Sequence, residues 1–240
     1  MKQVLPIFKR EFLGYFRSPI AYVFLAVFTL LAAALTVFLG GLFKGNAATL
    51  EGFFNLVPWM FIILGPASAM RLWAEERRSG TIELIFTLPV TTTEAVLGKF
   101  LAAWAFMSLG VLLTFPLVIT VAYLGDPDWG VIVTGYVGSI LMAAGYLGIS
   151  SLTSALTRNQ VVAFVIGFFI CLMLTLVGWS VFSGIMEAYL PIWLADSLAN
   201  FSFITHFDSM TRGLIALRGV VFFISLTFFT LLLNVIVLER

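Results

Sequence analysis

Long apolar segments alternate with short polar intervals along this chain. Six of the segments are long enough to form a helix that crosses the hydrocarbon core of a membrane, which takes about 20 residues. The pattern predicts an all-α integral membrane protein with spans at residues 20–43, 53–71, 95–124, 131–156, 161–182 and 220–238. Because these spans account for most of the sequence, residues 1–240 are expected to form a single transmembrane domain.

Residues 1–19 have an amphipathic pattern ahead of the first span. At 100° per residue, their apolar side chains fall on one face of a helix and their basic side chains on the other. This predicts an N-terminal helix that lies in the membrane interface and is broken at Ser18 and Pro19. We reject a cleaved signal peptide, because Glu11 and the rest of this helix precede the apolar run, which continues past the alanines at 32–34.

The longest charged interval lies at residues 71–99, where four basic and four acidic residues fall between the second and third spans. Gly80 is expected to end one short helix, and Thr81 to begin another over residues 82–88, which Pro89 ends. A short capped helix held in the 72–94 loop is typical of a docking element for a soluble partner. A surface connector that binds nothing is the alternative.

Local patterns predict details of the spans. Thr91 and Glu94 form a capping box that opens the third span. Gly65–Pro66 in the second span and Pro116 in the third predict kinks. In the fourth span, small residues recur every four positions, which lets neighbouring helix backbones approach closely; they are Gly135, Ser139 and Ala143 in one row and Ala144 and Gly148 in another.

The connection between the fifth and sixth spans, residues 183–219, is too apolar for a flexible loop and too interrupted for a span. It predicts short helices that dip into the outer leaflet or lie on it, with Asp208 and Arg212 paired one turn apart. His206 lacks the companion ligands that a metal or catalytic site needs. A helix-start or interfacial hydrogen-bonding role is therefore expected for it.

Composition supports the membrane assignment. Hydrophobic residues make up 61% of the chain, charged residues 10%, and the mean hydropathy is +1.10. No soluble domain can bury that much apolar surface. The formal net charge is only +1, so no overall field attracts nucleic acid, and no nucleic-acid partner is expected. Cys171 is the single cysteine, and its apolar surroundings predict a buried structural thiol.

The distribution of Lys and Arg predicts the orientation, because basic residues are more frequent in the cytoplasmic connections of membrane proteins. The 72–94 loop shares its side with ten basic residues, and three lie on the other side. The first set is Lys2, Lys9, Arg10, Arg17, Arg71, Arg77, Arg78, Lys99, Arg158 and Arg240, and the second is Lys44, Arg212 and Arg218. Both termini and the 72–94 loop are therefore expected in the cytoplasm.

Missing residue types exclude several function classes. Between their charged ends the spans contain no Asp, Glu, Lys, Arg or His, which an ion-coupled carrier or an intramembrane enzyme normally needs. The only Gly–Lys pair is Gly98–Lys99, and Thr93 stands where a phosphate-binding loop has its first glycine. The chain is therefore expected to bind no ATP or other cofactor itself, and not to be an enzyme.

Two segments resemble those of a known family, the type-2 ABC exporter permeases (ABC-2), and especially its bacterial gliding-motility-type subgroup. The sequence EERRSGTIELIFTLPV at 75–90, followed by Gly98–Lys99, is similar to the family's E-x-x-x-G-T-x-E-x-L-x-x-x-P segment and G-K pair. The sequence HFDSMTRG at 206–213 is similar to the subgroup's H-F-x-x-x-x-R-G segment. With the six spans and the N-terminal helix, the resemblance covers essentially the whole chain.

The resemblance implies two six-span permease subunits, as a homodimer or heterodimer in membrane lipid, with two cytoplasmic ATPase subunits that bind ATP and Mg²⁺. The helix at 81–88 would be the coupling helix. The residues implied to couple to the ATPase are Glu75, Glu76, Arg77, Gly80, Thr81, Glu83, Leu84, Pro89 and Lys99. The outer segment would cap the pathway, and its motif comprises His206, Phe207, Asp208, Arg212 and Gly213.

By the same resemblance, the chain is expected in a bacterial inner membrane, where it exports an unidentified substrate by alternating access. A membrane scaffold that binds the same ATPase without moving a solute, in an assembly or motility complex, is the second hypothesis, since fold alone does not define function. A solute that stimulates the ATPase activity of the purified complex would favour transport.

Overall fold

The computed structural model describes residues 3–40, 49–81, 90–189 and 191–239, and the regular elements in these ranges are all α-helices. In chain order they are α1 Val4–Phe16, α2 Pro19–Phe38, α3 Glu51–Ala69, α4 Ala74–Ser79, α6 Thr92–Leu112, α7 Phe115–Leu124, α8 Trp129–Leu156, α9 Gln160–Leu176, α10 Ser180–Tyr189, α11 Ile192–Ala199, α12 Phe203–Thr211 and α13 Leu217–Leu238. The prediction of an all-α membrane protein is confirmed.

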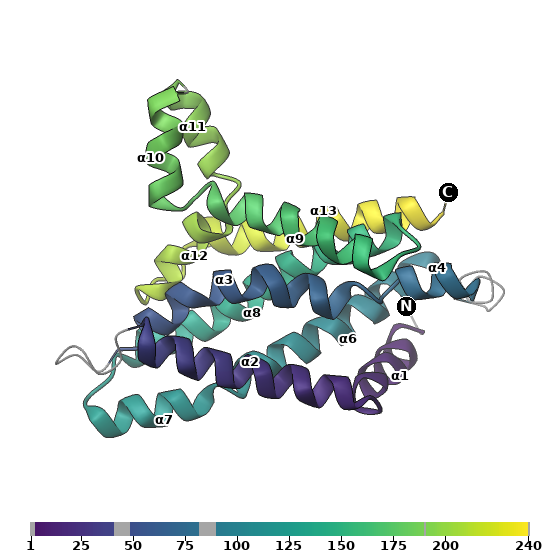
Figure 1. The fold of residues 1–240 in the computed structure, drawn as a ribbon, viewed down its shortest axis with the longest axis horizontal. Helices are drawn as coiled ribbons and strands as arrows, with labels where there is room; N and C mark the ends of the chain where they lie inside the picture. The colour runs from purple at the N-terminus through teal and green to yellow at the C-terminus, as the bar shows by residue number, and fades with distance from the viewer. Residues whose placement is uncertain (1–2, 41–48, 82–89, 190, 240) are drawn as a thin grey trace.

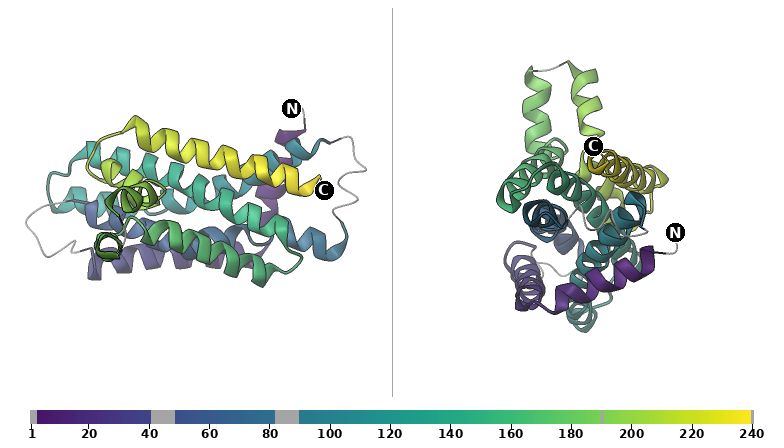
Figure 2. Two further views of the ribbon diagram at one scale, coloured as in Figure 1. Left: turned by 90° about the horizontal axis from the view of Figure 1, so that it is seen from above. Right: turned by 90° about the vertical axis from the view of Figure 1, so that its right-hand side faces the viewer.

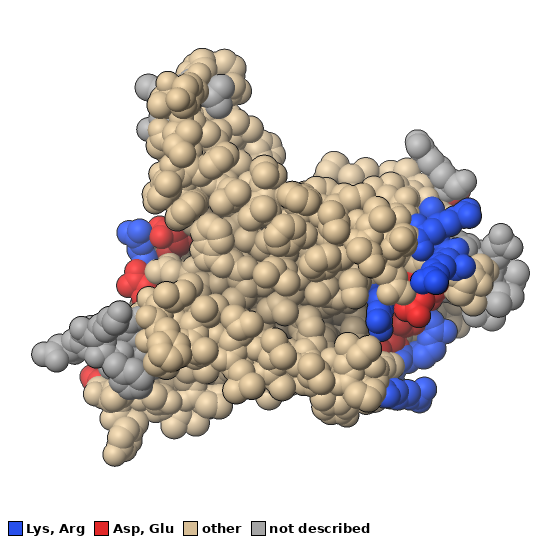
Figure 3. Space-filling view, in the orientation of Figure 1, with Lys and Arg blue, Asp and Glu red and all other residues tan. Residues whose placement is uncertain are grey.

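The spans run side by side along the long axis of the molecule (Figure 1). Helices α2, α8 and α13 each form one span, α3 continues into α4, and α6 continues into α7. The remaining pair, α9 and α10, is bent by 78°, so the described residues provide five spans, or six if the bent pair counts as one. On the face shown in Figure 3, charged residues lie at the two ends and leave an uncharged surface between them.

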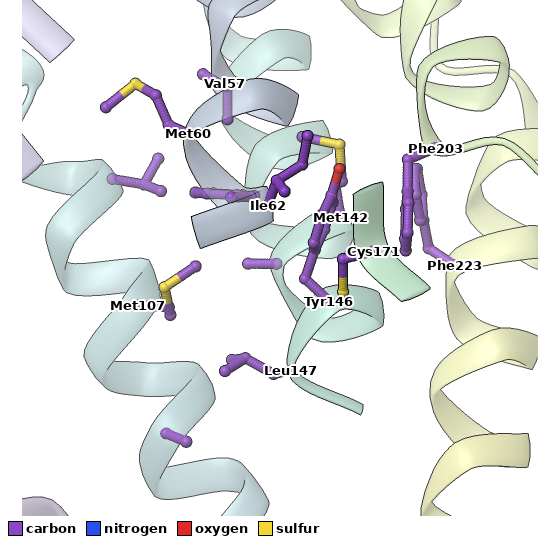
Figure 4. Packing of buried hydrophobic residues seen from close by; sticks show 14 of the residues in the cluster. Val57, Met60, Ile62, Met107, Met142, Tyr146, Leu147, Cys171, Phe203 and Phe223 are labelled. Atoms are coloured by element: carbon purple, nitrogen blue, oxygen red, sulfur yellow. The ribbon is translucent and has the colours of Figure 1, made fainter. Parts of the chain in front are cut away.

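Helix α8 lies at the centre of the bundle and packs against α3, α6, α9, α12 and α13. The predicted close approach at its small residues is confirmed, because a Cβ on Gly135 would collide with the Phe54 ring and one on Gly148 with Thr230. Tyr146 anchors the middle of the core, where its ring stacks on Phe203 at 4.0 Å and its hydroxyl hydrogen-bonds to Thr175 at 2.6 Å (Figure 4).

Two spans are interrupted. In the third, α6 ends at Leu112 and α7 begins at Phe115, next to the predicted kink at Pro116. The other predicted kink, at Gly65–Pro66, does not interrupt α3, which contains Pro66 and ends at Ala69. In the fifth, the predicted span extended to residue 182, whereas α9 ends at Leu176. The reason is close packing at the turn that follows, because a Cβ on Gly178 would collide with Ser202, just before α12.

The outer segment forms the short helices that the sequence predicts, but in two different settings. Helices α10 and α11 form a hairpin that projects sideways from one end of the bundle (Figures 1 and 2). Helix α12 packs against α8 and α13 and buries Phe203, Phe207 and Met210. The hairpin therefore adds little to the core, whereas α12 forms part of it.

Helix α1 crosses the opposite end of the bundle, where it packs against α6 and lies at a large angle to the spans (Figure 2). It ends at Phe16, and Ser18 and Pro19 then begin α2, as predicted: the Ser18 hydroxyl accepts a hydrogen bond from the Ile20 amide at 3.3 Å. The N- and C-termini both lie at this end (Figure 1).

Candidate coupling site at the charged end

Helix α4 stands at the charged end because a turn joins it to α3 and α8 holds that turn. The Ser154 hydroxyl of α8 accepts hydrogen bonds from the amides of Trp73 and Ala74, both at 3.1 Å, and donates one to the Met70 carbonyl at 2.9 Å. These are backbone groups that the ends of α3 and α4 cannot satisfy within their own helices. One buried hydroxyl thus fixes the direction in which the 72–94 loop leaves the bundle.

Helix α4 ends as the sequence predicts. Gly80 has a φ of 72°, in the left-handed region that glycine adopts without strain, and it stands directly after the last helical residue, Ser79. On the other side of the loop, Thr91 and Glu94 form the predicted capping box at the start of α6. Both helix ends that flank the loop are therefore well defined.

Lys99 joins three helices at this end. Its ammonium lies 2.8 Å from Glu76 Oε1 of α4 and 3.4 Å from Glu11 Oε1 of α1, and its side chain is only 5% exposed. It also lies 5.3 Å from the ring centroid of Trp73, which is fully buried. A buried ammonium needs such partners, because moving an unpaired ion out of water costs on the order of several kcal/mol. We call Glu11, Glu76 and Lys99 the ion-pair cluster.

The charge of Glu11 is stabilised within this cluster. Burial alone would raise the pKa of its carboxyl, but the positive charges of Lys99 and Arg10 outweigh burial, so the pKa lies below its ordinary value. Arg10 contributes through a hydrogen bond of 2.7 Å to Glu11 Oε1. Glu11 is therefore charged at neutral pH and holds α1 against α6.

Close packing supports the same contact between α1 and α6. A Cβ on Gly98 would lie 2.7 Å from Ile7 Cγ2, so only glycine lets the two helices approach this closely. Farther along α1, the Tyr15 ring stacks on Phe106 at 4.6 Å, and its hydroxyl donates a hydrogen bond to the Ser68 carbonyl at 3.3 Å. The Gly98–Lys99 pair thus provides both the close approach and the charge that hold α1.

Arg77 connects α4 to the C-terminal helix, since its guanidinium donates a hydrogen bond to the Val237 carbonyl of α13 at 3.2 Å. Glu75 and Arg78, by contrast, are exposed beside it on α4. Thr81 is also exposed and hydrogen-bonds through its hydroxyl to Ser79 at 2.9 Å. The predicted coupling residues therefore divide into an internal set that joins helices and an exposed set.

Three predicted coupling residues, Glu83, Leu84 and Pro89, lie outside the described residues, as does the predicted helix at 82–88.

The outer motif at 206–213 lies at the opposite end, where it joins α12 to α8 and α13. His206 is buried, its Nε2 hydrogen-bonds to the Asn200 carbonyl at 2.8 Å, and its ring stacks on Phe222 at 4.0 Å. Burial lowers its pKa, and the nearby Arg218 charge adds to this, while the bond to Asn200 opposes it. His206 thus has the hydrogen-bonding role that the sequence predicts.

The rest of the motif shapes the end of α12. Phe207 is buried, and Asp208 forms the predicted ion pair with Arg212, at 3.0 Å, on the surface. Gly213 has a φ of 85° and packs against Val131 at the start of α8, so the chain turns there as few other residues allow. These residues hold the outer segment together and lie far from the ion-pair cluster, at the other end of the bundle.

Sequence reasoning missed three residues that organise the charged end: Glu11, Trp73 and Ser154. A signal existed for Glu11, because it is the only acidic residue among residues 1–19 and follows two basic ones. Ser154 had none, since a serine within an apolar span usually bonds only to its own helix.

Comparison with known proteins places this arrangement in a family. A search of curated proteins finds no match. The model of the ABC-2 family transporter proteins matches residues 44–238, which include both motifs and all the spans except the first. Membership of this family makes the chain a membrane transport component, and it implies association with an ABC ATPase. The chain therefore belongs to the ABC-2 transporter family, as a transmembrane subunit.

Proposed function

We propose that this chain is the permease subunit of an ABC exporter in a bacterial inner membrane, and that its charged end couples ATP hydrolysis to substrate movement. In this proposal the two termini and the 72–94 loop face the cytoplasm, and two permease subunits work with two ATPase subunits. The ATPase subunits bind ATP and Mg²⁺, and the permease binds neither.

The ion-pair cluster is the observation that carries this proposal. Because α4 is bound to α1 and α6 through Lys99, to α8 through Ser154 and to α13 through Arg77, a displacement of the loop would reach four helices at once. A connector that binds nothing would not need such attachments. A force applied by a partner at residues 81–88 would therefore pass directly into the transmembrane bundle.

Alternating access requires two packings of the spans whose balance an ATPase can shift. The interrupted third and fifth spans support such a change, since helix breaks let one half of a span move relative to the other. The outer motif would then hold α12 at the far end of the pathway while the charged end moves.

The proposal is tested by purifying the tagged chain in mild detergent from its host and measuring which ATPase is retained. The variant Glu83→Arg should lose retention of the ATPase and its stimulation together, because it reverses a charge in the predicted coupling helix. The matched control is Asp126→Arg, the same acidic-to-basic reversal at an exposed position between α7 and α8, at the opposite end of the bundle. Equal retention by both variants would refute a coupling role for the loop.

Transport itself needs a second measurement. A solute that stimulates the ATPase activity of the reconstituted complex, and accumulates in vesicles only with ATP, would support export. An ATPase that is retained and coupled through the loop without any such solute would favour the scaffold hypothesis.

A further inference from the structure

A groove of about 410 Å³ opens beside α1 at the charged end, and the proposed function does not use it. It is bounded by α1, the start of α2, the turn between α3 and α4, and α6. Its volume falls within the range of about 300–1,000 Å³ that is typical of sites for small molecules.

The walls of the groove change from polar to apolar. The ion-pair cluster lies at one end, together with Arg71 and Glu75. Toward the uncharged belt of the bundle, the walls are formed by Ile20, Ala21, Phe24 and Phe106. A molecule that fills this space needs a polar head and an apolar tail, which is the chemistry of a membrane lipid.

The charges at the polar end define the head. Lys99 is already paired with Glu11 and Glu76, whereas Arg71 and Glu75 are exposed and have no ion pair among the described residues. The second oxygen of Glu76, Oε2, has no hydrogen-bond partner in the described part of the chain, but it is buried and therefore not open to a ligand in the groove. The groove thus offers one cation and at least one carboxylate acceptor to a ligand.

We infer that the groove binds a zwitterionic phospholipid with a primary ammonium, of the phosphatidylethanolamine class. The phosphate lies at Arg71, the ammonium donates hydrogen bonds to the carboxylate of Glu75, and an acyl chain follows α2 and α6. Phosphatidylcholine has no N–H group to donate, and phosphatidylglycerol has no cation, so neither matches the groove in the same way.

The position of the groove suits this ligand. Its lining runs from the charged residues of that end to apolar residues such as Ile20 and Phe24. When the uncharged belt of Figure 3 spans the hydrocarbon core, the boundary between the charged end and the belt is at the level of the lipid headgroups. A lipid bound there contacts α1 and the turn before α4 together. It would therefore stabilise the contact between α1 and the bundle.

The test uses the purified permease without any ATPase, so its outcome does not depend on the proposed function. Delipidated protein is incubated with vesicles that contain equal amounts of phosphatidylethanolamine, phosphatidylcholine and phosphatidylglycerol, repurified, and its retained lipids are measured by mass spectrometry. The wild type should retain phosphatidylethanolamine preferentially. The double variant Arg71→Ala/Glu75→Gln should retain it about tenfold less, the loss expected for one charge-assisted hydrogen bond.

A second variant fills the groove without removing any charge. Gly14 lines the groove, and a Cβ there meets nothing within 4 Å, so Gly14→Leu adds a side chain without a backbone collision. Gly14→Leu should lower lipid retention and leave the melting temperature of the protein unchanged. The matched controls are Arg158→Ala/Glu239→Gln, at the same end but outside the groove, and Gly184→Leu in α10, where a Cβ also has open space.

Three results would overturn the inference. Equal retention by wild type and both groove variants would show lipid that merely surrounds the spans. Equal retention of phosphatidylcholine would remove the role of the ammonium donor. A preference for phosphatidylglycerol that disappears with Arg71→Ala alone would indicate an anionic ligand instead.

Discussion

Replacing Gly98 with alanine tests whether close packing holds α1 against the bundle. The new Cβ would lie 2.7 Å from Ile7 Cγ2, 2.8 Å from Ile7 Cβ and 3.2 Å from the Val4 carbonyl oxygen. Because carbon atoms pack at about 3.5–4.0 Å, α1 must move away by about 1 Å. Nothing nearby can give way instead, since two of these three atoms belong to the backbone or to the first side-chain carbon.

A shift of that size weakens the polar contacts of α1. The ion pair between Lys99 and Glu11 and the hydrogen bond from Tyr15 to Ser68 are already 3.4 and 3.3 Å long. Polar contacts lengthened by a further ~1 Å no longer count as hydrogen bonds. Overpacking typically costs about 1–3 kcal/mol, and alanine recovers up to about 1 kcal/mol of helix propensity. The net loss of docking free energy therefore lies between about 0 and 3 kcal/mol, and about 1–2 kcal/mol is the middle of that range.

Trypsin provides the assay, because α1 carries the exposed cleavage sites Lys9 and Arg10. If cleavage requires α1 to detach, a loss of about 1–2 kcal/mol should accelerate it about 5- to 30-fold. The matched control is Gly110→Ala, which like Gly98 lies in α6. There the Cβ would meet only side-chain atoms of Phe28 and Leu25, at 3.3 Å or more. It should be cleaved at the wild-type rate.

The double variant Gly98→Ala/Ile7→Gly separates a local collision from general destabilisation. It removes the side-chain atoms that the new Cβ meets, so Gly98→Ala should be less damaging in the Ile7→Gly background than alone. If Gly98→Ala and Gly110→Ala were cleaved at the same rate as the wild type, close packing at Gly98 would not control the docking of α1.

Three further predictions concern charge, hydrogen bonding and pH. Lys99→Met removes the shared partner of Glu11 and Glu76 and should lower the free energy of unfolding by about 3 kcal/mol. The double variant Lys99→Met/Glu76→Gln should recover part of that loss. Equal denaturant unfolding of the two variants would contradict a buried ion-pair cluster. Ser154→Ala leaves the amides of Trp73 and Ala74 and the Met70 carbonyl without a partner and should cost about 1–3 kcal/mol in the same measurement, while Ser197→Ala, an exposed serine of α11, should cost little. Folding lowers the pKa of His206 below its ordinary 6.5, so the unfolded state binds the proton more tightly than the folded state. The stability of the protein should therefore be highest above pH 6.5 and fall as the pH drops below it. If the melting temperature of His206→Gln falls equally with pH, other groups cause the loss.

The elements that the sequence predicted well depend on local chemistry. The apolar segments, the capping box at Thr91, the helix end at Gly80 and the pair of Asp208 with Arg212 each involve residues close together in the chain. The small residues of α8 predicted close packing, but not which helices would fill the spaces. Partners such as Phe54 and Thr230 lie about 80 residues away in either direction along the chain, beyond the reach of a helical pattern.

The charged end shows the limit most clearly. The family resemblance implied that Glu76 and Lys99 couple to an ATPase, and this stays a prediction. In the structure these two residues pair with each other and with Glu11, a contact that the long sequence separation from α1 concealed. The bend after Leu176 was missed for the same reason, since it follows from contact between Gly178 and the distant Ser202.

The central position of α8 has a consequence for how the protein enters the membrane. Its small and hydroxylated residues make α8 less hydrophobic than α2 and α13, which cover the outside of the bundle. The span that contains α3 is also less hydrophobic than these two helices. A segment of that kind partitions into lipid weakly on its own, so it is best retained when a partner helix is already present. Because α3 is synthesised before α8 and α13 after it, α8 would lack one of its two main partner helices until the last span has been inserted. Truncation before residue 217 should therefore yield a chain whose fourth span is readily lost to quality control.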